Sequence, residues 1–207
     1  MNKLTTFYLV RHGETEYNVK KIIQGQSDSP LTKKGIEEVK NVAKKLKGIK
    51  FDYVFSSDLL RAKRTAEIIA LEHKLEIQTN KLLRERRFGN LEGKSNSELK
   101  WEKRFDNLTN EQKYTYKHSP DIESDEEIVT RFLTFIREVA IGYPRKTILV
   151  VTHGGIIRTS LVKFGFGNYD NLRPGAVKND AFVKLVTDGV DFFVKEVSGV
   201  QMVNQYA

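Results

Sequence analysis

Short apolar runs alternate with segments of helical periodicity along most of the chain. Phe7–Val10 and Phe51–Phe55 are brief runs of mainly apolar residues, as in strands that are buried on both faces of a sheet. Thr147–Val151 is similar and rich in β-branched residues, which favours a third strand. These runs predict the central strands of a sheet.

Between the strands, apolar residues recur at the three- and four-residue spacing of an amphipathic helix. Helices are predicted after Thr32, over Leu59–Leu71, after Ser124 and over Ile156–Phe164. Thr32 and residues 56–58 offer N-caps, and Ser124 with Glu127 fits a capping box. Gly48 is placed to end the first helix. Strands that alternate with helices predict an α/β sandwich with a mostly parallel sheet.

The rest of the chain predicts a hairpin and two irregular segments. Ala181–Thr187 and Val190–Val197 flank a turn pair, Asp188 and Gly189, which indicates an antiparallel hairpin. Residues 198–207 are expected to form a loose tail. Residues 90–122 are polar, partly helical in pattern and contain the single tryptophan, so we expect a helical insertion that covers one end of the sheet. With no repeat or linker, residues 1–207 are expected to form one domain.

Composition narrows the chemistry that the chain can perform. The 207 residues are 39% hydrophobic and 30% charged, with no cysteine and four histidines. Disulfides, thiolate zinc sites and a cysteine nucleophile are therefore excluded, and a histidine-rich metal centre is hard to build. No apolar run approaches the roughly 20 residues of a membrane span. We expect a cytoplasmic protein with no metal and no membrane partner.

The net charge of +8 raises the question of an anionic partner. Much of the excess falls on one predicted helix and its end, at Lys33, Lys34, Lys40, Lys44, Lys45, Lys47 and Lys50. Such a run is typical of a solvated helix face. No nucleic-acid-binding motif accompanies it, so nucleic acid is not an expected partner.

Two predicted strands end in a histidine followed by glycine. Val10 leads into Arg11, His12 and Gly13, and Val151 leads into Thr152, His153, Gly154 and Gly155. Ligands bind at the carboxyl edge of open α/β sheets. If the strands are neighbours, the two imidazoles face each other across a small pocket. The glycines allow backbone N–H groups, such as that of Gly154, to approach an anion.

Two arginines are expected near the same sheet edge. Arg11 precedes His12, and Arg61 falls in the first turn of the helix after the second strand, with Arg64 as an alternative one turn on. Guanidinium groups bind phosphate oxygens in a bidentate manner. Two histidines with two arginines favour a phosphate pocket over a metal site.

Phosphoryl transfer to a neutral imidazole also needs an acid that protonates the leaving oxygen. Glu85, in the segment 83–89, and Glu14, next to the first histidine motif, are both candidates. An acid beside a phosphate dianion can stay protonated near neutral pH. The residues by themselves leave the choice between Glu85 and Glu14 open.

The chain resembles the histidine phosphatase superfamily, which includes the cofactor-dependent phosphoglycerate mutases. The resemblance spans about residues 5–197 and rests on Arg11-His12-Gly13-Glu14-Thr15, Asp28-Ser29-Pro30-Leu31-Thr32, Ser56-Ser57-Asp58-Leu59-Leu60-Arg61-Ala62, Leu83-Arg84-Glu85 and Val151-Thr152-His153-Gly154-Gly155. Ile122 stands where a family Gly-Glu-Ser segment has glycine. The resemblance implies a three-layer sandwich of the phosphoglycerate mutase type.

The resemblance also implies the roles of individual residues. His12 would attack phosphorus and become a phosphohistidine, with its other ring nitrogen held by a backbone carbonyl. Arg11, Arg61 and His153 would hold the phosphoryl oxygens, and Glu85, now favoured over Glu14, would protonate the leaving oxygen. Further substrate or phosphate contacts are expected at Asn18, Gln24, Gly25, Arg86 and Gly154. His73 and His118 match no catalytic position.

The same pocket could serve a phosphatase or a mutase. The short separation between Glu85 and His153 and the short tail favour the phosphatases, because related mutases carry a long insertion and a C-terminal tail over the site. The segment Glu85-Arg86-Arg87-Phe88-Gly89 partly matches the mutase pattern Glu-Arg-His-Tyr-Gly. Other residues near Glu85 resemble the fructose-2,6-bisphosphatase-like branch, and Arg84, Arg86, Arg87 and Lys94 could bind a second phosphate or carboxylate.

We therefore predict a phosphomonoester hydrolase for a small phosphorylated metabolite, of the sugar phosphate or phosphoglycerate type. A phosphoglycerate mutase is the alternative, and a non-catalytic binding module is a minor one. No cofactor is expected for a hydrolase, whereas a mutase would need 2,3-bisphosphoglycerate. A homodimer is compatible with the sequence.

Overall fold

Six strands form one central sheet in the computed structural model, which describes residues 4–98 and 107–203. In chain order they are β1 (Thr5–Arg11), β2 (Tyr53–Ser56), β3 (Ile77–Thr79), β4 (Thr147–Thr152), β5 (Val177–Thr187) and β6 (Phe192–Val200). Their spatial order is β3-β2-β4-β1-β5-β6. The short edge strand β3 was not predicted, because only three residues pair there and two of them are exposed.

The sheet is parallel on one side and antiparallel on the other. β3, β2, β4 and β1 run parallel to their neighbours, whereas β5 is antiparallel to β1 and β6 is antiparallel to β5. The parallel strands are joined through helices, as parallel connections require, and β5 and β6 form the predicted hairpin. The expected mostly parallel sheet is confirmed.

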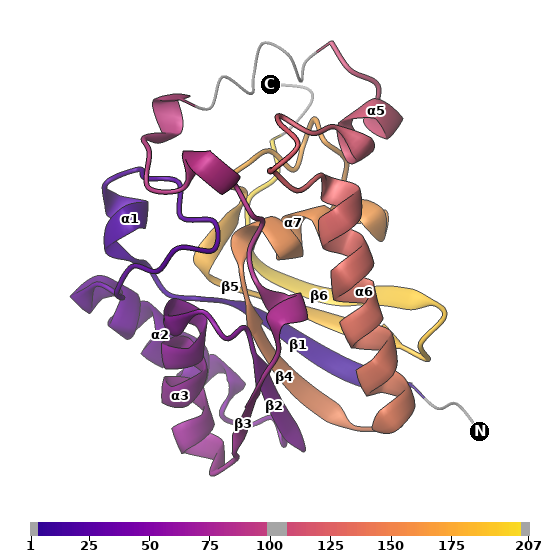
Figure 1. The fold of residues 1–207 in the computed structure, drawn as a ribbon. Coiled ribbons are helices and arrows are strands. Elements are labelled where there is room, and N and C mark those ends of the chain that lie inside the picture. Colours follow the sequence, from indigo (N-terminus) through magenta and orange to yellow (C-terminus); the bar gives the residue numbers. More distant parts are fainter. Residues whose placement is uncertain (1–3, 99–106, 204–207) are drawn as a thin grey trace.

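Helices cover both faces of the sheet (Figure 1). The helices are α1 (Glu16–Val19), α2 (Lys33–Leu46), α3 (Leu60–His73), α5 (Asn110–Thr115), α6 (Asp125–Gly142) and α7 (Gly154–Lys163), with short 3₁₀ turns η1 (Lys81–Leu83), η2 (Gly89–Leu91) and η3 (Asn96–Glu98). α2 and α3 pack on one face, and α6 and α7 pack on the other. The three-layer α/β sandwich is therefore confirmed.

The apolar run in β1 contributes to both halves of the core. Phe7 and Leu9 are buried beneath α6 and α7, whereas Tyr8 and Val10 are buried beneath α2 and α3. Successive side chains of a strand point to opposite faces. Because both faces of β1 are buried, apolar and polar residues do not alternate along the strand. The same burial holds the end of β1 in the sheet.

Two of the three predicted caps are present. The Thr32 hydroxyl accepts from the N–H of Gly35 at 2.9 Å, and Ser124 forms the full capping box with Glu127. The predicted cap at residues 56–58 is wrong, because α3 begins at Leu60 and the residue at its N-cap is Leu59, which has no capping side chain. There the Asp28 carboxylate, from a distant loop, accepts from the Leu60 N–H at 3.0 Å.

The chain end is more ordered than the expected loose tail. β6 extends to Val200, which pairs with Val177, so residues 198–200 belong to the sheet. The Gln201 N–H then donates to the carbonyl of Ala176 at 2.8 Å. Residues 204–207 lie outside the described residues.

The described parts of the predicted insertion at residues 90–122 lie at one end of the sandwich (Figure 1). Its described parts hold η3 and α5, and α5 packs against α6. The remaining part, residues 99–106 with Trp101, lies outside the description. Within the described ranges, none of the helices is long and apolar enough to cross a membrane.

Candidate active site

The two strand-end histidines lie side by side. β1 and β4 are parallel neighbours in a register that pairs Arg11 with Thr152, so the next residue of each strand is His12 or His153. The His12 N–H donates to the carbonyl of Thr152 at 3.1 Å. The ring centroids are 5.2 Å apart with planes at 60°, and both side chains are buried. The expected pairing of the imidazoles is thus present.

Hydrogen bonds give the two nitrogens of His12 different roles. Nδ1 lies 2.8 Å from the carbonyl oxygen of Gly13, to which it can only donate, and this contact fixes the tautomer. Nε2 then carries the lone pair and accepts from Nε of Arg61 at a long 3.3 Å. The nucleophilic nitrogen of the ring therefore faces a guanidinium group.

Burial keeps both imidazoles neutral. Burial lowers the pKa of His12 well below its usual value, and the positive charges of Arg61 and Arg11 lower it further. Burial and the charge of Arg61 lower the pKa of His153 in the same way. Among the described residues, neither ring nitrogen of His153 has a hydrogen-bond partner. A buried polar group without a partner is costly, so His153 is well placed to bind a ligand oxygen.

Arg61 is buried in the first turn of α3 and is held by the loop of residues 24–29. Its Nη1 donates to the carbonyl of Ser27 at 2.7 Å, and its Nη2 donates to that of Gly25 at 2.6 Å. Burial lowers its pKa to about 10, which still leaves a full positive charge at neutral pH. The backbone carbonyls therefore orient a permanent cation beside Nε2 of His12.

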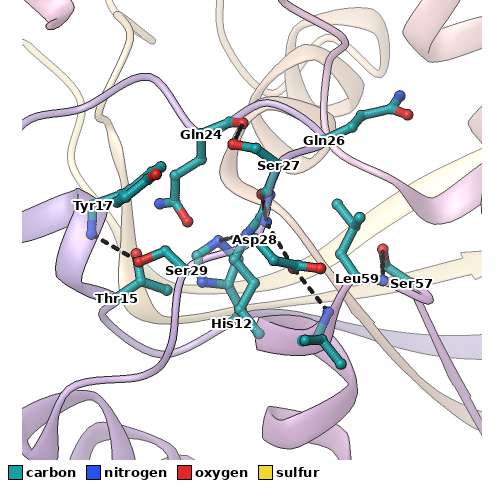
Figure 2. Close-up of polar contacts among 12 residues, drawn as sticks. His12, Thr15, Tyr17, Gln24, Gln26, Ser27, Asp28, Ser29, Ser57 and Leu59 are labelled. Atoms are coloured by element: carbon teal, nitrogen blue, oxygen red, sulfur yellow. Dashed lines mark hydrogen bonds and ion pairs between the residues drawn. The ribbon is translucent and has the colours of Figure 1, made fainter. Parts of the chain in front are cut away.

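The loop that holds Arg61 is itself fixed on several sides. Figure 2 shows it next to His12, with dashed lines from Ser27 to the carbonyl of Gln24 and from the hydroxyl of Ser29 to the N–H of Tyr17. Gly25 has φ +52°, and a Cβ there would lie 2.3 Å from the Glu92 carboxylate. This position therefore requires glycine.

Arg11 reaches the same space from the end of β1. Its Nη1 donates to the carbonyl of Val177, while its buried Nε has no partner among the described residues. A Cβ on Gly154 would come within 3.1 Å of that Nε. The glycine therefore lets the guanidinium lie against the N-terminus of α7, where an anion is also favoured by the helix dipole.

Two backbone N–H groups hold the carboxyl of Glu85, and one of them lies at the start of α7. Oε2 of Glu85 accepts from the N–H of Gly155 at 3.0 Å, and its Oε1 accepts from the N–H of Arg86 at 2.8 Å. Arg131 from α6 donates to the Glu85 carbonyl at 3.1 Å, and the Thr152 hydroxyl donates to that of Leu83 at 2.9 Å. These hydrogen bonds from α6 and β4 thus fix the backbone of the segment that carries the Glu85 carboxyl.

The other candidate acid, Glu14, is engaged elsewhere. Its carboxylate accepts from the Thr32 hydroxyl at 2.9 Å and from Nζ of Lys34 at 2.8 Å. The bond from Lys34 is the main reason that the pKa of Glu14 lies below its usual value. A carboxylate held ionised in this way is a poor proton donor, and Glu14 does not line the cavity described next.

One cavity of about 570 Å³ collects most of the predicted site residues. Its lining includes Arg11, His12, Asn18, Gln24, Gly25, Arg61, Glu85, Arg86 and Gly154. His153 lies beside His12 but outside the lining set. His73 instead packs edge-on against Phe51, with ring centroids 4.9 Å apart, away from the cavity.

The cavity lining differs from the sequence-based expectation at several residues. Of the four proposed for a second anion, only Arg86 lines the cavity, whereas Arg84 forms an ion pair with Asp58 at 2.6 Å. The cavity is also lined by Lys113, Arg158, Tyr169, Asp170 and Arg173, which were not predicted. Arg158 follows Gly154 by four residues, about one turn of α7. This helical spacing could have predicted from the sequence that Arg158 lies on the same side of the helix as Gly154.

The site can therefore hold a tetrahedral anion beside a nucleophile and an acid. His12, Arg11, Arg61 and Glu85 all line the cavity, and Nε2 of His12 lies beside the Arg61 guanidinium. Burial lowers the pKa of both arginines, and the charge of Glu85 is the largest influence that opposes it. Across the described ranges, no group of three or more His, Cys, Asp or Glu side chains is placed to hold a metal.

The chain matches a known family model and is similar to a known protein. The family model described as "Histidine phosphatase superfamily (branch 1)" matches residues 7–198. A Bacillus subtilis (strain 168) protein described as "Uncharacterized phosphatase PhoE" is 33% identical over 165 residues, which are 80% of each chain.

Solved structures give the same fold. Bacillus stearothermophilus YhfR superposes with a TM-score of 0.78 at 30% identity, over 92% of this chain and 95% of that one. A phosphoglycerate mutase from Bacillus anthracis str. Sterne superposes with a TM-score of 0.77 at 28% identity, over 94% and 93% of the two chains.

Proposed function

The chain belongs to the histidine phosphatase superfamily, branch 1, and from this premise we propose that it is a phosphomonoester hydrolase that works through a phosphohistidine. Its substrate is a small phosphorylated metabolite of the sugar phosphate, bisphosphate or phosphoglycerate type. The observation that carries the proposal is the buried, neutral His12, whose Nδ1 is fixed by Gly13 and whose Nε2 faces Arg61.

The first step transfers the phosphoryl group to the enzyme. Nε2 of His12 attacks phosphorus and the bond to the substrate oxygen breaks, while the protonated carboxyl of Glu85 gives its proton to the leaving oxygen. Because Nδ1 keeps its proton against the Gly13 carbonyl, the charge that develops on the ring is stabilised there.

The second step returns the enzyme to its starting state. A water molecule gives a proton to the Glu85 carboxylate and attacks phosphorus, and the bond between phosphorus and His12 breaks. Inorganic phosphate leaves, and both residues regain their first protonation states. One carboxyl thus serves as acid and then as base.

The cations stabilise the transition state of both steps. Negative charge spreads over the three equatorial phosphoryl oxygens as phosphorus moves between the two partners. Arg11 and Arg61 supply fixed positive charge, and His153 supplies an N–H from an imidazole that has no other partner among the described residues. These donors are already held in place, so little reorganisation is needed during the reaction.

A phosphoglycerate mutase is the second candidate. The likeness to a solved mutase and the position of Arg86 in the cavity favour it. A mutase would return the phosphoryl group to its substrate and would need 2,3-bisphosphoglycerate, whereas the hydrolase needs no cofactor. The short span between Glu85 and His153 supports hydrolysis.

The partner is a small phosphorylated metabolite, and neither nucleic acid nor a membrane takes part. The protein acts in the cytoplasm, and a homodimer is compatible with this function.

Phosphorus NMR with 3-phosphoglycerate and catalytic 2,3-bisphosphoglycerate separates the two candidates. We expect inorganic phosphate to accumulate, with an unchanged rate when EDTA is added. Growth of 2-phosphoglycerate without free phosphate would establish the mutase instead. If neither signal changes, p-nitrophenyl phosphate and a panel of sugar phosphates show whether the site turns over at all.

Substitution of His12 tests the nucleophile. His12→Ala should abolish turnover and the acid-labile phosphoenzyme that the wild type forms with radiolabelled substrate. His73→Gln is the matched control, because it removes a histidine that lies away from the cavity. Full activity in His12→Ala would exclude His12 as the nucleophile.

A further inference from the structure

The segment that carries Glu85 has no regular secondary structure of its own. Residues 84–88, which follow the 3₁₀ turn η1, belong to no helix or strand, and Arg84 is extended with φ −62° and ψ 151°. Backbone groups outside a helix or sheet need partners from elsewhere in the chain. The place of the Glu85 carboxyl therefore depends on the side chains that bind this backbone.

Arg131, in the second turn of α6, binds two carbonyls of the segment. Its Nη1 donates to the carbonyl of Leu82 at 2.8 Å, and its Nη2 donates to that of Glu85 at 3.1 Å. α6 also packs against η1. One guanidinium group thus fixes both the start of the segment and the residue that carries the carboxyl.

Glu123 holds the same guanidinium and the far end of the segment. Its Oε1 accepts from Nε of Arg131 at 2.9 Å, and its Oε2 accepts from Nη2 of Arg131 at 3.0 Å, which makes the ion pair bidentate. Oε2 also accepts from the N–H of Arg87 at 2.8 Å, and the N–H of Glu123 donates to the carbonyl of Arg87 at 3.0 Å. The Arg131–Glu123 pair therefore binds the backbone on both sides of Glu85.

The Arg131–Glu123 pair is largely buried but lies outside the cavity. The two side chains are 16% and 14% exposed, so water screens their interaction little. Neither residue lines the cavity that contains His12. Burial is the main reason that the pKa of His153 is low, and the charge of Arg131 adds to that effect. Arg131 thus lies close behind the reacting groups and acts through the residues that it holds.

The N–H of Gly155 reports where the Glu85 carboxyl lies. Gly155 is in the first turn of α7, where a backbone N–H has no partner inside the helix. It donates to Oε2 of Glu85 at 3.0 Å, while Oε1 accepts from the N–H of Arg86 at 2.8 Å. If the segment moves away from α7, the first of these bonds is lost and the carboxyl leaves its place in the cavity.

We infer that the Arg131–Glu123 pair positions Glu85 for proton transfer to the leaving oxygen, an inference that rests on the acid role given to Glu85 in the proposed function. Arg131 is the positioning residue, and Glu123 fixes the orientation of its guanidinium group. Proton transfer needs the acid within hydrogen-bond reach of the leaving oxygen, and a displacement of about 1 Å can cost about 100-fold in rate.

The leaving-group dependence of the rate tests this inference. In Arg131→Gln, kcat/KM for glycerol 3-phosphate should fall at least about 10-fold, whereas that for p-nitrophenyl phosphate should fall less than about three-fold, because its phenolate leaves without protonation. A general loss of structure would lower both alike. Glu123→Gln should act in the same direction, and Arg131→Lys should restore part of the loss, because lysine keeps a positive charge and N–H donors.

Arg137→Gln is the matched control for these variants. Arg137 is an exposed arginine of the same helix, and it lies outside the cavity. Its substitution should leave both rates close to those of the wild type. A similar selective loss in Arg137→Gln would show that the effect is not specific to the Arg131–Glu123 pair.

A double-mutant cycle tests whether Arg131 acts through Glu85. In the Glu85→Gln background, Arg131→Gln should lower kcat/KM for glycerol 3-phosphate by less than about two-fold, because the acid has already been removed. If the two losses multiply in full, Arg131 acts by another route and the inference is overturned.

Amide hydrogen exchange tests the position of the carboxyl without turnover. In Arg131→Gln, the N–H of Gly155 should exchange at least about five-fold faster than in the wild type. The N–H of Ile128, which donates to the carbonyl of Ser124 at 3.3 Å, should keep its rate and so show that the start of α6 is folded. If Ile128 also loses protection, Glu123→Gln takes the place of Arg131→Gln in each measurement.

The two proposals fail in different ways. Unchanged exchange at Gly155, or equal losses on the two substrates, overturns the inference even when the wild type is an active phosphatase. If the wild type releases phosphate from no substrate, the hydrolase proposal fails, and the exchange at Gly155 decides by itself whether the Arg131–Glu123 pair positions Glu85.

Discussion

At the scale of single residues, hydrogen-bond partners separate two glutamates that look equivalent in sequence. Glu85 is held by two backbone N–H groups inside the cavity, whereas Glu14 is bound by Lys34 and Thr32. Of the two, Glu85 lines the cavity and its carboxyl accepts from backbone N–H groups, whereas Glu14 lies outside the lining and accepts from a lysine. The surroundings of the two carboxyls therefore differ, although both follow candidate motifs in the sequence.

Substitution of Glu85 should slow the hydrolysis of substrates with poor leaving groups most strongly. Glu85→Gln cannot donate a proton, so kcat/KM for alkyl phosphates such as glycerol 3-phosphate should fall by about 100-fold or more. The fall for p-nitrophenyl phosphate should be much smaller, because its phenolate leaves without protonation. Steady-state kinetics on both substrates measures the difference.

Glu14→Gln is the matched control for this experiment. It should lower both rates by a similar, smaller factor, because the hydrogen bonds of Glu14 stabilise the loop after β1 and do not involve the leaving oxygen. Equal losses on both substrates in Glu85→Gln would show that Glu85 binds substrate rather than donating the proton.

At the scale of elements, α2 supports the first histidine motif by close backbone packing. A Cβ on Gly35, in the first turn of α2, would lie 2.1 Å from the carbonyl oxygen of Glu14, and a Cβ on Gly13 would lie 2.5 Å from the carbonyl of Gly35. Two glycines thus allow the helix and the loop after β1 to touch. The position of His12 depends on this contact.

Gly35→Ala should therefore disturb stability and activity together. The added methyl group must displace the loop, at a cost of about 1–3 kcal/mol in the free energy of unfolding. Gly48→Ala is the control, because nothing lies within 4 Å of its Cβ position. Urea denaturation and turnover should both change in Gly35→Ala and stay close to wild type in Gly48→Ala. Wild-type behaviour of Gly35→Ala would show that the loop adapts without cost.

At the scale of the whole molecule, the site places neutral imidazoles inside a buried, positively charged region. The pKa values of His12 and His153 in the folded protein lie well below the usual 6.5. The unfolded chain therefore binds more protons than the folded one at pH values below about 6.5. Stability is full above that pH and falls as the pH falls.

Acidification should thus weaken the fold in a window where carboxylates still stay ionised. Between pH 6.5 and 5, the free energy of unfolding should fall by at most about 1.4 kcal/mol per pH unit for each of the two histidines. Urea titrations at several pH values, in buffers without phosphate, measure the slope. His153→Gln should make the slope shallower, and an unchanged slope in this variant would contradict the assignment.

Several features of the fold and the site could be predicted from the sequence because they depend on neighbouring residues. The apolar runs in β1 and β4 and the capping box at Ser124 are local signals. The histidines follow their strands directly, so predicting the strands also located His12 and His153. The roles of individual residues rest on the resemblance and stay predictions.

The wrong predictions concern segments whose structure depends on contacts with residues far away in the chain. Residues 56–58 carry good capping side chains, but the helix begins later, at Leu60, and Asp28 binds its first N–H instead. The tail was expected to be loose, yet residues 198–200 pair with β5. Neither contact has a signal in the adjacent sequence.

The sequence by itself determined the alternation of strands and helices and the positions of the two histidines, because periodicity and capping act over a few residues. The residues without the family resemblance left the choice between Glu85 and Glu14 open, and the tertiary structure placed Glu85 in the cavity. Only the tertiary structure revealed that Asp125 binds both Arg86 and Arg158. These contacts join residues that are far apart in the chain, and the packing of α6 and α7 on one face of the sheet brings them together.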